Sequence, residues 1–279
     1  MDERLLEATK TYARDMASPP AVDTMLLELD GCEIRTGVSM IAVEAGVSDR
    51  DAQERVRVEN WRDVRTGLAR PLATKEQRLY VCRMDSYDEV LEQLFGVACV
   101  QGLTPLSHVV VPGDGAKGLR EAVLVTFPKA QYMLDHPPLK SHLYDTASAV
   151  ELEGAARHAW VSDHLEQFWA GEVDQVLAAW QQHHEDAPNE RLRQLIDHVT
   201  RFEDSVDYGV YHDRGWPLGS GEVESAHRYV PQERLKIAGA CWNPDNVNPM
   251  LALRVVRANG WWDEFWRWRL AQRQAQVGV

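Results

Sequence analysis

At 279 residues the chain is long enough for one large domain or two small ones, and its hydrophobic fraction of 44% is ample for a packed core, so extensive disorder is excluded. The N-terminal segment lacks the basic and then apolar profile of a signal peptide, and no apolar run approaches the roughly 18 residues of a membrane span, so we expect a cytoplasmic protein with no membrane partner. The net charge of −13 counts against nucleic acid as a partner, because proteins that bind phosphate backbones normally carry a basic surface.

The first elements along the chain predict a helix, a linker and three strands. Residues 1–22 suit a helix followed by a loose linker, and the apolar run TMLLELDGCEIRTG then suits a strand that delivers Asp30 to its end. A second strand is expected from Val56 and a third from Arg78. Their short connections favour an antiparallel meander.

A helix and two further strands are expected next. SYDEVLEQLFGVACVQGL has apolar residues at helical intervals, with Ser86 as N-cap and Gly102 as a stop. HVVVPGDGAKGL then gives an apolar strand that leads to Asp114, and AQYMLDHP gives a shorter strand that ends at Asp135. The order strand, helix, strand implies a crossover and a parallel neighbour.

The remainder of the chain is mostly helical in pattern. Helices are expected from Leu139 to about Tyr208, as a second domain or an insertion; WPLGSGEVES then opens a helix at Glu222, and the tail from Asn246 is helical again. In that tail Trp261, Phe265 and Trp268 form one stripe, for which packing into the core is favoured over stacking on bases. The fold class is therefore α/β.

Two features of composition qualify this outline. Residues 226–279 hold eight lysines and arginines against four acids, a net charge of +4 within an acidic chain, for which a solvated helix face is the ordinary explanation. The four cysteines, at positions 32, 82, 99 and 241, form no C-x-x-C pair. We therefore expect buried thiols, and neither a disulfide framework nor a zinc ribbon.

Asp30 and Asp114 are predicted at strand ends, where ligands of open α/β sheets commonly bind. A third acid from a helix would complete an oxygen-rich site for Mg²⁺, and two such ions can clamp the attacking and leaving oxygens of a phosphoryl displacement. The simpler interpretation makes each aspartate a turn former and Ser220 an N-cap, with Glu224 paired to Arg228. The helical wheel does not choose between Glu222 and Glu224 as the third acid.

Five segments together resemble the catalytic part of DDE-type transposases of bacterial insertion sequences, nearest the ISKra group. They are ELDGCEIRTG (28–37), VVVPGDGAKGLRE (109–121), LDHPPLKSHLY (134–144), GWPLGSGEVESAHRYVPQERLKIAGACW (215–242) and NPMLALRVVRANGWWDEFW (248–266). The resemblance runs from about residue 24 through nearly the whole chain, and its separated motifs keep one order.

The resemblance implies a ribonuclease-H-like mixed sheet with a mostly helical insertion before the last catalytic acid. By position it makes Asp30, Asp114 and Glu224 the catalytic residues and the ligands of two Mg²⁺ or Mn²⁺ ions, and Arg228 and Lys236 candidate DNA-backbone contacts. The expected organisation is an N-terminal helix and linker (1–22), a catalytic domain (23–144 and 209–245), a helical insertion (145–208) and a helical tail (246–279).

Two departures from the family pattern affect these expectations. Pro138 stands where the family pattern L-D-x-P-H-L-K has histidine, which leaves His136 and His142 as imperfect substitutes. Relatives also carry a longer N-terminal region that reads the transposon ends, whereas this chain begins 29 residues before Asp30. A missing basic region would account for the acidic charge and would leave phosphate contacts mainly to the C-terminal third.

The resulting prediction is a transposase that cleaves DNA and joins the cut end to a target, acting on transposon ends and target DNA as a homo-oligomer. Two alternatives stay open. One is an inactive fragment that regulates by pairing with the full-length protein through the helical block, and the other is a ribonuclease-H-like nuclease unconnected with mobile DNA.

Overall fold

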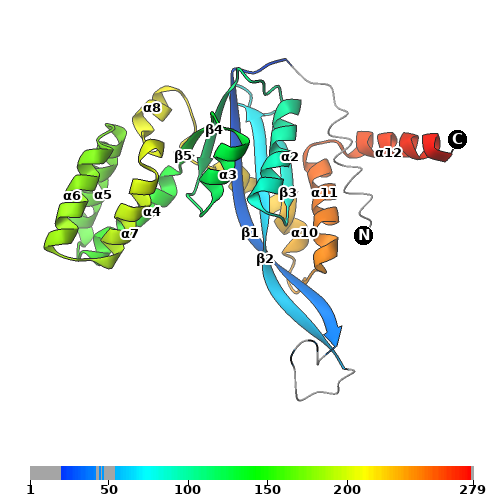
Figure 1. The fold of residues 1–279 in the computed structure, drawn as a ribbon, viewed down its shortest axis with the longest axis horizontal. Helices are drawn as coiled ribbons and strands as arrows, with labels where there is room; N and C mark the ends of the chain where they lie inside the picture. The colour runs from blue at the N-terminus through cyan, green and yellow to red at the C-terminus, as the bar shows by residue number, and fades with distance from the viewer. Residues whose placement is uncertain (1–19, 42–43, 45, 47–53, 278–279) are drawn as a thin grey trace. The chain divides into compact units, whose positions relative to one another are not determined.

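The computed structural model describes residues 20–41, 44, 46 and 54–277. The helix expected at the start of residues 1–22 therefore lies outside the described residues. The chain divides into two compact units (Figure 1). Unit 1 takes in the residues up to His108 and those from Gly221 onward, and unit 2 is the intervening stretch, Val109–Ser220.

Three antiparallel strands in the order β3-β2-β1 form the sheet of unit 1. They are β1 (Thr24–Ile41), β2 (Arg55–Pro71) and β3 (Leu79–Arg83). Strands that follow one another in the chain lie side by side, so the expected antiparallel meander is confirmed.

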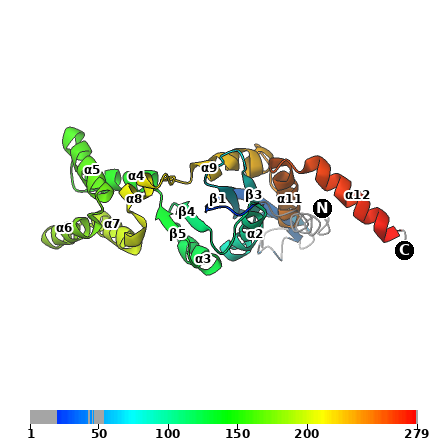
Figure 2. The ribbon, with the colours of Figure 1, turned by 90° about the horizontal axis from the view of Figure 1, so that it is seen from above.

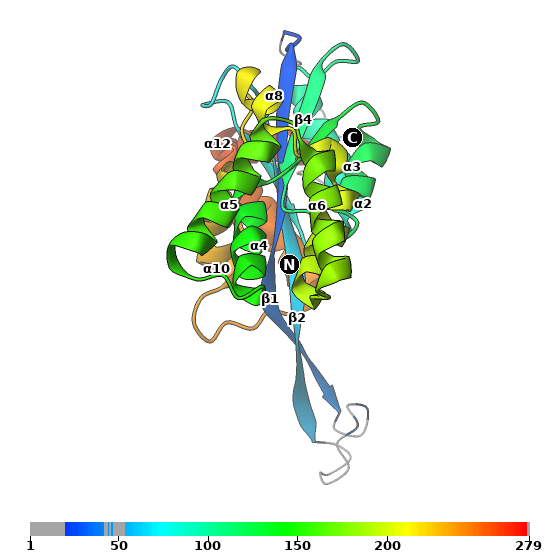
Figure 3. The same cartoon turned by 90° about the vertical axis from the view of Figure 1, so that its left-hand side faces the viewer.

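The prediction that the first strand ends at Asp30 is wrong. β1 continues to Ile41, and Asp30 lies opposite Thr66 within the β1-β2 register. The fully buried run does stop near Asp30, but the polar stretch beyond it still pairs with β2 residue by residue. Backbone pairing with β2 therefore continues the strand beyond its buried part. The outer parts of β1 and β2 project as a two-stranded ribbon (Figure 3).

Helices cover this sheet. α2 (Tyr87–Val100) begins at the expected N-cap, where Ser86 and Glu89 form a capping box. After unit 2 the chain returns through short segments that lead into α11, and α12 extends away from α11 (Figure 2). These segments are α9 (Gly221–His227), the π-helix η2 (Arg228–Gln232), α10 (Glu233–Leu235), the 3₁₀-helix η3 (Pro244–Asn246), α11 (Val247–Ala258) and α12 (Trp262–Val277).

The hydrophobic core of unit 1 lies between the sheet and the segment from α9 to α11. Strand residues such as Ile34 and Leu68 meet helix residues such as Val223 and Leu251, all of them fully buried. In the tail, Trp261 and Phe265 are also buried, which confirms core packing for these two members of the aromatic stripe, while Trp268 is half-buried. The cysteines are free thiols, but only Cys82 is buried.

Unit 2 begins with two parallel strands. β4 (His108–Gly113) and β5 (Gln131–Leu134) are joined by α3 (Leu119–Thr126), so the expected strand, crossover and parallel neighbour are present. The helical block that follows starts earlier than expected, at His136, because prolines in its first turn are compatible with a helix start. It comprises α4 (His136–Ala149), α5 (Gly154–Trp169), α6 (Val173–Asp186), α7 (Glu190–Arg201), the 3₁₀-helix η1 (Glu203–Ser205) and α8 (Tyr208–Asp213).

The fold is therefore α/β, with antiparallel strands in unit 1, a parallel pair in unit 2 and helices in both. Among the residues that the structure describes, no helix combines the length and the apolar character that crossing a bilayer requires.

Candidate functional site

Asp30 lies on the face of β1 that meets α9. Its Oδ1 accepts a 2.6 Å hydrogen bond from the Gly31 backbone N–H, and its Oδ2 lies 3.4 Å from Nδ1 of His227, the last residue of α9. The His227 side chain is only 7% exposed, and its Nε2 is 3.3 Å from the Asp30 carbonyl oxygen. This histidine therefore contacts both the side chain and the backbone of Asp30 and restricts how the carboxylate is oriented.

A second carboxylate on the same face of β1 fixes the start of α9. Glu28 precedes Asp30 by two positions, so the pleat sends both side chains to one side. Glu28 is fully buried and accepts a 2.7 Å hydrogen bond from the Val223 backbone N–H, in the first turn of α9. That bond satisfies a donor that has no partner within the helix, so Glu28 and Asp30 hold the two ends of α9 along the strand.

The two glutamates of α9 have different surroundings. Glu222 is bound by two arginines, with Oε1 2.7 Å from Arg70 Nη2 and Oε2 2.6 Å from Arg78 Nε. Burial raises the pKa of Glu222, but the hydrogen bonds and charges of these arginines outweigh it and leave the pKa below its ordinary value. Glu224 is exposed and, within the described residues, forms no ion pair with Arg228.

The direction of each glutamate follows from the helix geometry. At 100° per residue, Glu222 and Glu224 lie on opposite flanks of Val223, and His227 lies on the Glu224 side. Glu222 therefore faces the arginines of β2 and the β2-β3 link, and Glu224 lies on the flank whose histidine reaches Asp30. The structure thus separates the two glutamates where the sequence does not, and it leaves Glu224 available for a ligand.

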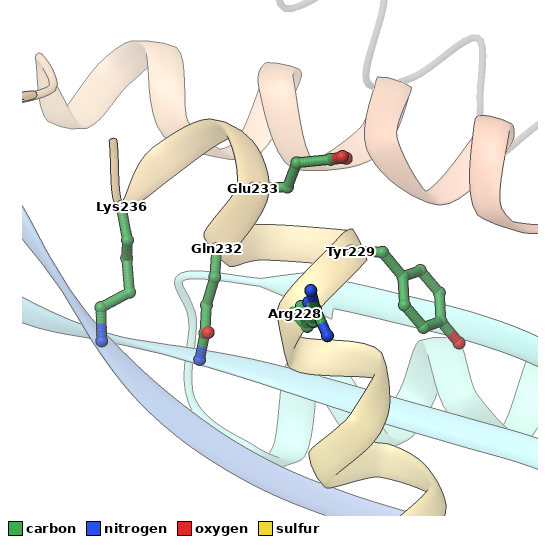
Figure 4. Close-up of a pocket in the computed structure, with 5 residues that line it drawn as sticks. All are labelled: Arg228, Tyr229, Gln232, Glu233 and Lys236. Atoms are coloured by element: carbon green, nitrogen blue, oxygen red, sulfur yellow. The ribbon is translucent and has the colours of Figure 1, made fainter. Parts of the chain in front are cut away.

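The helical segment that follows α9 forms an open groove of about 550 Å³ (Figure 4). Its lining residues are Arg228, Tyr229, Gln232, Glu233 and Lys236. Gln232 and Lys236 point toward the strands, whereas Tyr229 and Glu233 point the other way (Figure 4). The π-helix η2 contains Pro231, which has no N–H to donate, and single-turn π segments of this kind are frequent at functional sites.

The groove is cationic and adjoins the strand of Asp30. Cys32, two positions beyond Asp30 on the same face of β1, has a pKa raised by burial and lowered in part by the nearby Lys236 and Gln232. The one acid in the groove lining, Glu233, forms an ion pair with Arg254 of α11, which also lowers the pKa of that carboxyl. The charges of Arg228 and Lys236 are therefore the ones left to attract an anion.

Asp114, the second predicted acid, lies in unit 2 directly after β4. It is exposed, and its Oδ1 accepts a 2.9 Å hydrogen bond from the Ala116 backbone N–H, as an aspartate in a turn does. Gly115 has a φ of +78°, and a Cβ at this position would lie 2.9 Å from Leu134 and 3.0 Å from His198. Only glycine combines that conformation with that close packing, so the turn that carries Asp114 is tightly defined.

Two histidines lie behind this turn. His198 of α7 is centred 5.1 Å from the ring of His142 on α4. Burial, with the charges of His142 and Arg201, lowers the pKa of His198 to about 4, while Asp114 acts in the opposite direction. His136, the other substitute for the missing family histidine, instead packs against Trp169 and Tyr208. Of the two substitutes, His142 is therefore the one whose ring contacts His198, the histidine that packs against Gly115.

The structure brings two of the three predicted acids, Asp30 and Glu224, onto neighbouring elements of unit 1 and places Asp114 in unit 2. Across the described part of the chain, no three or more His, Cys, Asp or Glu side chains stand as a group that could hold a metal ion. Sequence reasoning missed Glu28, His227 and Arg70. A glutamate between two leucines of a buried strand, and a histidine three residues after Glu224, were the available signals.

Comparison with known proteins assigns no family to this chain: no protein-family model matches it, and no curated protein matches it either.

Proposed function

We propose that this chain is the catalytic part of a DDE-type transposase that cleaves DNA and transfers the cut strand. The observation that carries the proposal is the arrangement along β1 in unit 1. Asp30 is held by His227, Glu224 lies on the same flank of α9, and a cationic groove continues along the strand past Cys32. Carboxylates beside a cationic groove suit a metal-dependent reaction on a phosphodiester.

The carboxylates fit a hard divalent cation by their chemistry. The resemblance makes Asp30, Asp114 and Glu224 the ligands of two Mg²⁺ or Mn²⁺ ions, and such ions take carboxylate oxygen ligands. When bound, the ions would supply activation of a water or a 3′ hydroxyl and stabilisation of the leaving oxygen. Glu222 fits this role poorly, because both of its oxygens already accept hydrogen bonds from Arg70 and Arg78.

The chain's own residues position the substrate and the carboxylates. His227 orients Asp30, and Arg228 and Lys236 bind backbone phosphates on transposon ends and target DNA, with the protein acting as a homo-oligomer. The antiparallel meander, the parallel pair and the helical stretch before Glu224 are compatible with a ribonuclease-H-like fold, as this function requires.

The proposal is tested by Glu224→Gln in a DNA-processing assay. With Mn²⁺, the wild-type chain should nick supercoiled plasmid and join a labelled 3′-hydroxyl oligonucleotide to it, and a chelator should abolish both. Glu224→Gln should reduce both rates by at least about 100-fold, because an amide is a far weaker metal ligand than a carboxylate. Circular dichroism and thermal unfolding should match wild type, since the side chain is exposed.

Glu92→Gln is the matched control, because Glu92 is an exposed helical glutamate of the same unit, on α2. It should keep both rates within about twofold of wild type. Equal activity in Glu224→Gln and wild type would overturn the proposal. Nicking without joining would favour the ribonuclease-H-like nuclease, and no activity together with stable pairing to an intact transposase would favour the regulator.

A further inference from the structure

The α12 helix presents an exposed aromatic face. Its start is anchored by the buried Phe265, with Trp261 just before the helix buried as well. Trp262 and Trp266 are about 40% exposed, at 41% and 39%, and Leu270 is 57% exposed. These three residues recur at intervals of four, so they lie along one side of the helix. The two indole rings are 5.7 Å apart, between centroids, and nearly perpendicular.

Arginines interleave with these tryptophans on the same side. On a helical wheel, Arg269 and Arg273 fall within about 60° of both Trp262 and Trp266, whereas Asp263 borders the face beside Leu270 and Glu264 lies on the far side of the helix. The Arg269 guanidinium carbon lies 6.0 Å from the centre of the Trp266 ring, and Arg273 is exposed. We call the side formed by Trp262, Trp266, Leu270, Arg269 and Arg273 the α12 aromatic face.

We propose that the α12 aromatic face binds unpaired nucleic acid, with bases stacked on Trp262 and Trp266 and phosphates held by Arg269 and Arg273. Stacking on aromatic rings beside a row of cations is how proteins bind single strands without sequence readout. Duplex DNA hides the faces of its bases, so a stacking surface discriminates in favour of unpaired strands. Arg269 and Arg273 give this face a local positive charge that suits an anionic partner, within a chain whose net charge is −13.

The inference rests on the proposed function in taking DNA as the nucleic acid, since strand cleavage and transfer expose unpaired ends. A membrane surface or a second copy of the chain would also cover apolar side chains. Arginines interleaved with partly exposed tryptophans fit stacked bases and phosphates better than either. Those two occupants are outcomes of the test below.

The test measures binding of a fluorescein-labelled 20-nucleotide oligothymidylate to the full chain by anisotropy, with a chelator present so that no cleavage intervenes. The double variant Trp262→Ala, Trp266→Ala should bind at least about 10-fold more weakly. The double variant Trp262→Phe, Trp266→Phe should recover most of that affinity, which a purely structural defect would not allow. A duplex of the same length should bind with an affinity that the tryptophan substitutions leave unchanged.

Two matched controls separate the face from general effects. Trp61→Ala removes a 57% exposed tryptophan of the β1-β2 ribbon and should leave oligothymidylate binding within about twofold of wild type. Arg273→Ala should flatten the dependence of log affinity on log salt by about 0.7. Arg267→Ala, which removes an exposed arginine outside the face, should change that slope less.

Wild-type affinity in the double alanine variant overturns the inference. A change in solution mass by light scattering, or in binding to anionic vesicles, with oligothymidylate binding intact, overturns it too. Failure of the proposed function is distinguishable. Tryptophan-dependent binding without Mn²⁺-dependent cleavage would contradict the transposase proposal and support binding at the α12 aromatic face. Cleavage together with tryptophan-independent binding would support the transposase proposal and contradict binding at that face.

Discussion

Glu222 and Glu224 show how two residues of one type, two positions apart, acquire different roles. Glu222 lies against Arg70, whose side chain is 2% exposed and also donates to the Pro71 and Leu72 carbonyls. A buried guanidinium needs its full set of acceptors and a balancing charge, so the Glu222 carboxylate is required for stability. The exposed Glu224 is not needed to balance a buried charge, and this difference selects it as the candidate ligand.

Glu222→Gln should therefore lower stability in a pH-dependent way. Above pH 4.5 the variant should unfold with a free energy about 2 kcal/mol smaller than wild type, because Arg70 loses its counter-charge while one acceptor oxygen remains. The pKa of Glu222 is lowered in the folded state, so its contribution is present above the ordinary value of 4.5 and is lost as pH falls through the folded pKa.

Urea unfolding at pH 7 and pH 3.5 checks this, with the exposed Glu224→Gln as the control that should stay within about 0.5 kcal/mol of wild type at both values. A gap between Glu222→Gln and wild type that is equally large at pH 3.5 would show that the charge of Glu222 is not what stabilises Arg70.

The candidate site was predictable from sequence only in part. Acids beside glycines and strands identify Asp30 and Asp114 as candidates, because those patterns are local. The partners of the acids are not local: His227 lies 197 residues from Asp30, and Val223 lies 195 residues from Glu28. The choice between Glu222 and Glu224 likewise depends on Arg70, which precedes Glu222 by 152 positions. Periodicity carries no information about such pairs.

Among the elements, β1 shows where the hydrophobic pattern of the sequence predicts the structure and where it does not. The apolar run that defines its first half is a burial signal and is correctly identified as a strand. Its second half has only scattered buried residues, such as Ile34 and Thr36, and none beyond Gly37, so hydrophobic alternation is weak there. The strand continues because β2 supplies a partner at every position. Buried strands are predictable from one segment, whereas a solvated ribbon needs knowledge of both.

β3 is the edge strand of unit 1, and asparagines of the C-terminal region complete its hydrogen bonds. Asn259, which follows α11, accepts from the Tyr80 N–H at 2.8 Å and donates to the Tyr80 carbonyl at 3.1 Å. Asn248 accepts from the Met84 N–H at 2.8 Å. These side chains occupy edge groups that would otherwise offer a template for pairing with another chain.

Asn259→Ala should destabilise unit 1 by about 2 kcal/mol, because two half-buried backbone groups of Tyr80 lose their partners. Aggregation on heating should also increase, as the edge is uncovered. Urea unfolding and light scattering measure the two effects, and Asn60→Ala on the exposed ribbon serves as the control with little change in either. If both variants behave alike, the asparagine does not cover the edge.

Across the chain as a whole, titratable groups are divided unequally between the two units. Among the described residues, the histidines with a lowered pKa all lie in unit 2, and burial is the largest cause for each. They are His136, His142, His164 and His198. In unit 1 the shifted acids are glutamates whose pKa is lowered from 4.5, namely Glu59, Glu222 and Glu233.

Unit 2 should therefore lose stability at a higher pH than unit 1. A histidine whose pKa is lowered stays neutral in the folded state while the unfolded chain takes up a proton below pH 6.5, so stability falls from that value down to the folded pKa, about 4 for His198. His198 alone should cost about 1 kcal/mol at pH 5 once solvent screening is allowed for.

Calorimetry at pH 7.5 and pH 5 tests this division. If the units unfold independently, one transition should move down by at least about 4 °C at pH 5 and the other should stay in place, since the glutamates of unit 1 are still ionised there. His198→Phe, which keeps a ring beside Phe202 but has no titrating group, should reduce the shift, and the exposed His183→Phe should not. A single transition that moves as one would mean that the units unfold cooperatively, and an unchanged shift in His198→Phe would mean that the proton is taken up elsewhere in unit 2.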